Sequence, residues 1–184
     1  MNESTTGSSR HILPEKMAKK DIVSALETRF VVDETEGVSE KVTLVDSFEW
    51  GLYTNDLIAF RYENNDIAIW HADDLFASDQ VSLIHSGNPQ ARFWWDVAAT
   101  PERTLLEKIL CLRALLTMSE GVLTIEDYNL QDENGKTLVF CQLVSFHRAE
   151  TADVPLLTQV KLEPVTGYQE EYQQAAELLE QMGG

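Results

Sequence analysis

Alternation of apolar and polar residues runs through most of the chain and predicts strands joined by short turns. The predicted strands cover residues 25–33, 39–46, 57–63, 66–71, 80–85, 92–97, 121–130, 136–146 and 158–163. Two of the intervening turns, at Asn64-Asn65 and Asn134-Gly135, contain residues that tolerate a positive φ angle. The pattern therefore predicts a sheet built from antiparallel hairpins.

Two stretches repeat their apolar residues at helical spacing instead. The first begins with Thr100 as the N-cap and Pro101 at the first helical position, and its leucine-rich face continues to about residue 116. The second runs from about Gln169 to Met182. Many antiparallel strands with two helices predict an α+β domain, most simply a curled sheet or barrel. We expect Trp50 and Tyr53 to pack beneath the corner that follows the second strand.

The net charge of the chain disfavours some classes of binding partner. The 184 residues include 31 acidic and 14 basic side chains, which gives a net charge of −17. This charge repels nucleic acids and anionic membranes, so we expect neither as a partner. Residues 1–20 are polar and hold four of the basic side chains. They are predicted to form a flexible tail, with the folded domain over residues 21–184.

Cysteine usage and hydropathy point to the cytoplasm. Cys111 and Cys141 both lie in apolar contexts without a CxxC motif, so we interpret them as small core residues in a reducing compartment. The N-terminus lacks the apolar segment of a signal peptide, and no apolar run approaches the roughly 20 residues of a membrane span. We therefore predict a soluble cytoplasmic protein.

Several segments, in order along the chain, resemble the CYTH-like domains that precede CHAD domains in bacterial proteins. The segment from Val42 to Tyr53 reads VTLVDSFEWGLY and is similar to the second strand and corner of that family. Further similar segments are 57–63, 111–116, 132–139 and 162–168, the last reading LEPVTGY before a terminal helix. The resemblance covers residues 25 to 182. It implies the triphosphate tunnel superfamily, with a closed or nearly closed antiparallel β-barrel of about eight strands.

In active members of this superfamily, the resemblance implies, Lys and Arg side chains line the tunnel and hold a triphosphate. Acidic residues hold the divalent metal, because a phosphate needs convergent cations and Mg²⁺ needs hard oxygen ligands. The first-strand pattern E-x-E-x-K falls on residues 25–29. Ala25 then replaces the first acid, Glu27 keeps the second, and Arg29 supplies the cation. Glu27 is thus a weak candidate for a metal ligand.

The family's strand with two alternating arginines falls on residues 60–62, where this chain has Phe60, Arg61 and Tyr62. In the register that we favour, Phe60 and Tyr62 line the lumen together with Trp70, and Arg61 points away from it. A shift by one residue would reverse this arrangement. Glu27, Arg29 and Arg61 are therefore vestigial catalytic candidates, and the three aromatic residues are candidate ligand-binding residues.

The loss of charged tunnel residues predicts a catalytically degenerate CYTH-like domain that serves as an accessory or interaction module. Its expected partner is a CHAD-type helical domain or another basic protein surface, which would link it to polyphosphate, and no cofactor is expected. The alternative is a divergent inorganic triphosphatase that hydrolyses tripolyphosphate with Mg²⁺. A third interpretation is a small-molecule binder with an aromatic lumen.

Overall fold

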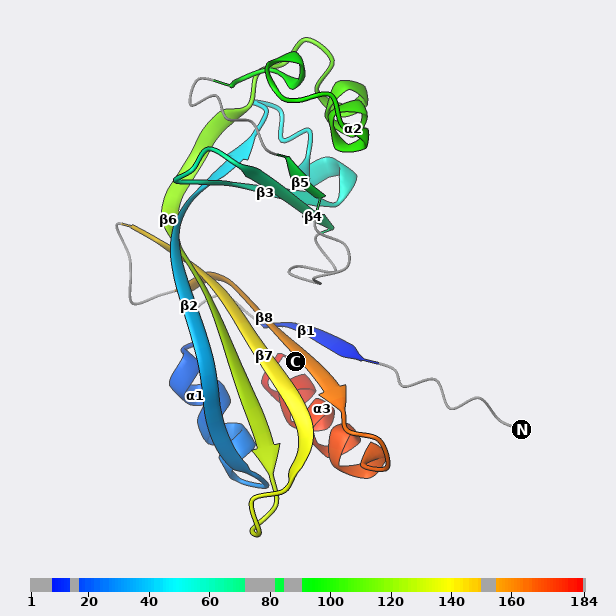
Figure 1. Ribbon diagram of the computed structural model, residues 1–184. Coiled ribbons are helices and arrows are strands. Elements are labelled where there is room, and N and C mark those ends of the chain that lie inside the picture. The colour runs from blue at the N-terminus through cyan, green and yellow to red at the C-terminus, as the bar shows by residue number, and fades with distance from the viewer. Residues whose placement is uncertain (1–7, 14–16, 72–81, 85–90, 150–154, 184) are drawn as a thin grey trace, which may run out of the picture. The chain divides into compact units, whose positions relative to one another are not determined.

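The computed structural model describes residues 8–13, 17–71, 82–84, 91–149 and 155–183. Within them, eight strands form one antiparallel sheet in the order β1-β8-β7-β6-β2-β3-β4-β5, accompanied by three α-helices (Figure 1). This confirms the predicted α+β class and the strand number. The elements in chain order are β1 Ser9–Leu13, α1 Lys19–Glu27, β2 Val31–Asp46, η1 Tyr53–Asn55, β3 Leu57–Tyr62, β4 Ile67–His71, β5 Ser82–Ile84, η2 Trp94–Asp96, α2 Pro101–Leu110, β6 Leu116–Gln131, β7 Thr137–Arg148, β8 Pro155–Pro164 and α3 Gln169–Gly183.

The chain divides into two compact units, each with its own apolar core. The first unit comprises residues 1–39 and 123–184, and the second comprises residues 40–122. The 16-residue strands β2 and β6 contribute residues to both units.

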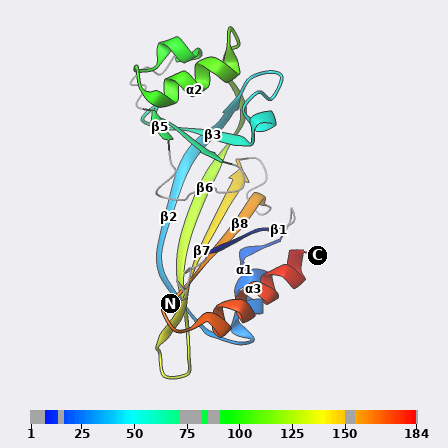
Figure 2. The ribbon, with the colours of Figure 1, turned by 90° about the vertical axis from the view of Figure 1, so that its right-hand side faces the viewer.

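In the first unit, α1 and α3 pack on one face of strands β6, β7 and β8 (Figures 1 and 2). Ile22 and Leu26 of α1 and Ala175 and Leu179 of α3 are buried against the strands. Each fully buried Leu or Ile stabilises the fold by about 1.5–3 kcal/mol, because its apolar surface leaves water. The strand residues that form this core are Leu13, Tyr128, Leu130, Leu138, Val139, Cys141, Leu143, Val160 and Leu162.

In the second unit, α2 covers one face of strands β3 and β4. Leu106 and Leu110 of the helix are buried with Leu57, Ala59, Ile67 and Ile69 of the strands. Thr100 caps the helix by accepting a hydrogen bond from the Arg103 amide, as its sequence predicted. Arg103 also lies over the ring of Trp94, which packs against the same core.

The predicted strand over residues 25–33 is wrong. Residues 19–27 form helix α1, and β2 begins only at Val31. Ile22, Leu26 and Phe30 are spaced by four residues and are all buried in the first core. Helical periodicity therefore outweighs the β-branched residues that follow it.

Part of the predicted tail is also folded. Residues 9–13 form strand β1, which pairs antiparallel with β8 so that His11 lies opposite Val160. Leu13 is buried in the first core. Five residues with polar neighbours give too short an alternation to be recognised, and the partner strand lies some 150 residues further along the chain.

Three further local predictions require correction. Residues 92–97 contain the 3-10 helix η2 instead of a strand, because Asp96 Oδ2 accepts the amides of Arg92 and Phe93 and bends the chain. The helix that starts at Pro101 ends at Leu110, and β6 begins at Leu116. Cys111 is exposed, whereas Cys141 is buried as predicted, and burial raises the pKa of its thiol to about 12.

Both predicted hairpin turns are confirmed, with positive φ angles of 69° at Asn65 and 79° at Gly135. Of the strand predicted at residues 80–85, the structure describes only β5, Ser82–Ile84, and the other residues lie outside the described ranges. None of the described helices has the length and apolar character needed to cross a membrane.

Candidate functional site

The structure does not place Glu27 and Arg29 together on a strand. Glu27 is the last residue of α1, Arg29 follows in the turn before β2, and both side chains are exposed. The first strand of the sheet is instead β1, whose residues Ser9–Leu13 include no acid. The E-x-E-x-K pattern therefore has no counterpart on this strand, and the carry-over to residues 25–29 fails because those residues form the end of helix α1 and the turn after it.

Glu27 does line a pocket of about 510 Å³ in the first unit, beside Lys19, Glu34, Tyr128 and His147. Lys19 Nζ lies 2.5 Å from Glu126 Oε1 and 3.4 Å from Glu34 Oε2, and 5.6 Å from the centre of the Tyr128 ring. Burial lowers the pKa of Lys19, but its hydrogen bond to Glu126 and the negative charge of that carboxylate outweigh burial and raise the pKa above its usual value. The ammonium is thus already neutralised by carboxylates, which leaves little attraction for a phosphate.

The face of the first unit's sheet opposite α1 and α3 is polar. Val160 and Leu162 point into the core, so Lys161 and Glu163 point to the other side of β8. We call this the polar face and define it by the residues Thr35, Asp127, Asn129, Phe140, Gln142, Lys161 and Glu163, which line a hollow of about 320 Å³. This is the strand face on which the resemblance leads us to expect tunnel cations.

Charges on the polar face are paired with one another. Lys161 Nζ lies 2.6 Å from Glu163 Oε1, and Gln142 Nε2 donates a 2.9 Å hydrogen bond to Asp127 Oδ1. Arg10 stands opposite Lys161 in the β1–β8 ladder. Within the described ranges, no three His, Cys, Asp or Glu side chains gather as metal ligands. The residues present do not fit a Mg²⁺ site, which needs several oxygen ligands in octahedral geometry.

Arg61 belongs to the opposite side of β3 from Phe60, as the favoured register has it. Its Nη2 donates a 2.6 Å hydrogen bond to the carbonyl of Ala91, on the face that carries the second core. Burial and the neighbouring Arg92 lower the pKa of Arg61. The guanidinium thus anchors the chain at Ala91.

Phe60, Tyr62 and Trp70 share the other face of β3 and β4. Phe60 and Trp70 are buried, with ring centres 5.8 Å apart in an edge-to-face arrangement. Burial, followed by the charge of Glu40, raises the pKa of Tyr62 to about 12. The predicted aromatic cluster therefore exists, and its role as a ligand-binding lumen stays a prediction.

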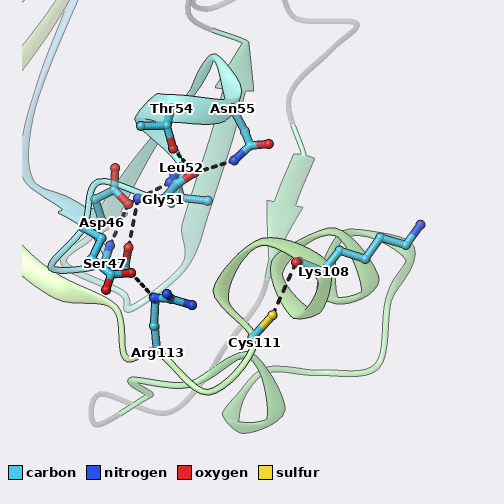
Figure 3. Close-up of polar contacts among 10 residues, drawn as sticks. Asp46, Ser47, Gly51, Leu52, Thr54, Asn55, Lys108, Cys111 and Arg113 are labelled. Atoms are coloured by element: carbon cyan, nitrogen blue, oxygen red, sulfur yellow. Dashed lines mark hydrogen bonds and ion pairs between the residues drawn. The ribbon is translucent and has the colours of Figure 1, made fainter.

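Asp46, which was not among the candidate site residues, organises the loop that follows β2 (Figure 3). Its buried Oδ1 accepts the amides of Ser47 and Leu52 at 2.6 and 2.8 Å, and its Oδ2 accepts the amide of Tyr53 at 3.0 Å. Ser47 Oγ accepts the Gly51 amide at 2.9 Å, and a Cβ at Gly51 would lie 2.9 Å from this same oxygen. A side chain at position 51 would therefore displace the Ser47 hydroxyl and cost this hydrogen bond. In the sequence, the signal available for this loop was an Asp at the end of an apolar strand, followed five residues later by Gly.

The aromatic side chains of this loop are not packed beneath the corner as predicted. Phe48 is 82% exposed, Trp50 45% and Tyr53 62%. Trp50 and Tyr53 contact each other edge to face, with ring centres 6.2 Å apart. We call residues 48–53 the aromatic loop. Glu49 of this loop forms an ion pair with Arg113, which ties it to the segment after α2 (Figure 3).

No protein-family model matches this sequence, and no curated protein matches it significantly. Among solved structures, it is similar to HpAC1 from Hippeastrum, a protein assigned as an adenylyl cyclase that has a dominant triphosphatase activity. The TM-score is 0.42 at 11% sequence identity, over 96% of this chain and 87% of that chain. A likeness at this level establishes neither a shared family nor a shared activity.

Proposed function

We propose that this chain is a CYTH-like domain that has lost triphosphatase activity and acts as an interaction module for a basic protein. One observation carries the proposal: Lys161, on the polar face where a phosphate would bind, is held by Glu163 at 2.6 Å beside the carboxylate of Asp127. The ordered resemblance of residues 25–182 to CYTH-like domains supports the family.

Electrostatics argue against a bound triphosphate. Several convergent cations are needed to compensate a multiply charged phosphate. In the described part of the chain, the hollow of the polar face is lined by one cation, Lys161, and by two carboxylates, Asp127 and Glu163. The net charge of −17 further repels a polyanion during approach.

The same charge favours a basic protein as the partner. A CHAD-type helical domain fits this description, and polyphosphate would then bind to that partner and not to this chain. We expect the two proteins to be recovered together at physiological salt when this chain is used as bait. A CHAD-type domain that stayed entirely unbound would remove this part of the proposal.

The deciding experiment is a calorimetric titration of the full chain with tripolyphosphate, with and without Mg²⁺, while phosphate release is followed in the same samples. We expect neither binding nor release. Lys161→Ala and Arg61→Ala are the matched variants. Mg²⁺-dependent release that Lys161→Ala abolishes would overturn the proposal and establish the triphosphatase alternative. Binding without release would identify a polyphosphate sensor.

A further inference from the structure

We propose that the aromatic loop, residues 48–53, is the docking surface for the basic protein partner, with Trp50 as its main anchor. This inference rests on the proposed function and adds to it the place of contact and the chemistry of recognition. Three large aromatic side chains stand exposed within six residues, and such exposure indicates a binding surface in a folded protein.

The loop is rigid although its rings are exposed. Asp46 accepts three backbone amides, Ser47 accepts a fourth, and Asn55 Nδ2 donates to the carbonyl of Gly51 at 2.8 Å. An exposed ring on an ordered backbone loses little conformational freedom when a partner binds. The hydrogen bonds of Asp46 thus hold the aromatic loop ready for contact.

Backbone strain at Trp50 is an independent observation. Its φ angle is 57°, in the left-handed region that Gly and Asn adopt far more easily than an aromatic residue. Burial does not explain why a tryptophan occupies this position, because nearly half of the residue is exposed to solvent. A strained aromatic residue whose side chain is nearly half exposed, with one ring contact to Tyr53, points to a function in binding.

Charge selects the class of partner. The loop from residue 46 to 56 holds three acidic residues and no basic one, and residues 40–122 hold 13 acidic and 6 basic residues. An anionic membrane is repelled by this charge, and a second copy of a chain at −17 is repelled as well. Lys and Arg side chains of a basic protein would be attracted and would stack on the exposed faces of Trp50 and Tyr53.

The test uses the full chain and a defined probe, a 16-residue helical peptide with leucine on one face and arginine on the other. Its dissociation constant is measured by calorimetry for the wild type, for Trp50→Asn and for Phe140→Ser. Phe140 is the matched control, because it is 50% exposed but lies on β7 in the other unit. Neither substitution changes the charge of the protein.

We expect Trp50→Asn to weaken binding by tenfold or more, and Phe140→Ser to change it by less than twofold. Asn tolerates the left-handed conformation, so Trp50→Asn should unfold at the same or a higher urea concentration than the wild type. Loss of binding in a variant of undiminished stability cannot come from unfolding.

Four outcomes would overturn the inference. In the first, Trp50→Asn binds the peptide as tightly as the wild type, and in the second, Phe140→Ser weakens binding as much as Trp50→Asn does. In the third, the wild type does not bind the peptide. In the fourth, the wild type associates with itself and Trp50→Asn abolishes this association. The first would mean that charge alone attracts the probe, and the last that a second copy covers the loop. None of them involves phosphate release, so the loss of triphosphatase activity is judged separately.

Discussion

At the scale of single residues, Asp46 orders the loop after β2 through its carboxylate. One carboxylate accepts three backbone amides and fixes the direction of the chain between β2 and η1. Neither propensity nor periodicity could reveal this role, because the identity of the three amides depends on how the loop closes. The turns at Asn65 and Gly135 were predictable, since their conformation follows from the residue itself.

We predict that Asp46→Ala lowers the free energy of unfolding by about 3 kcal/mol, because buried amides lose a charged acceptor. Urea denaturation followed by circular dichroism measures this loss. Asp56→Asn is the control, since Asp56 is exposed and its φ of 57° suits asparagine. A loss below 1 kcal/mol for Asp46→Ala would show that water replaces the carboxylate.

The candidate site also shows what residue types alone can predict. The contact between Phe60 and Trp70 was predictable, because strand alternation and a short hairpin bring both side chains to one face of the sheet. The pairing of Lys161 with Glu163 escaped notice, although residues two apart on a strand share a face. The prediction for Glu27 and Arg29 was wrong because it placed the motif on an expected strand, whereas the segment up to Glu27 forms helix α1.

At the scale of elements, the segments between clear turn residues were predictable, whatever their length, and the N-terminal segments were not. Helix α3 and the strands β3, β4 and β7 lie where the sequence pattern places them, whereas β6 begins five residues before its predicted start at residue 121. Helix α1 was missed because its apolar positions merge with the β-branched start of β2. Strand β1 depends on a partner far along the chain, so only tertiary structure makes it visible.

We expect strand β1 to contribute to the stability of the first unit. A chain that begins at residue 14 should lose about 2–3 kcal/mol of unfolding free energy, because Leu13 leaves the core and the ladder with β8 is lost. Chemical denaturation measures this, and a chain that begins at Ser8 is the control. If both truncated chains unfold at the same urea concentration, β1 is dispensable.

At the scale of the whole molecule, the excess of acidic residues dominates. A net charge of −17 on 184 residues creates repulsion within the folded chain, and dissolved salt screens it. The expectation that nucleic acids and anionic membranes are not partners follows from this number alone and stays a prediction.

Salt is therefore predicted to stabilise the protein. Raising NaCl from roughly 0.02 M to roughly 0.5 M shortens the Debye length from more than 20 Å to less than 5 Å. We expect the melting temperature, measured by calorimetry, to rise by several degrees. A variant with Glu40, Glu63 and Glu177 changed to Gln should respond less, because these exposed carboxylates contribute to the repulsion. A melting temperature that falls with salt would contradict the prediction.

The two cysteines differ in exposure, so the protein can be labelled chemically at one position. Cys141 is buried and its thiol has a pKa near 12, whereas Cys111 is exposed at the end of α2. Because the thiolate is the reactive species, a maleimide dye should attach to Cys111 and leave Cys141 unmodified in the native state. Cys111 lies two residues before Arg113, the ion-pair partner of Glu49 in the aromatic loop. The natural sequence thus accepts one fluorophore close to the proposed docking surface, where its emission can report the arrival of a partner.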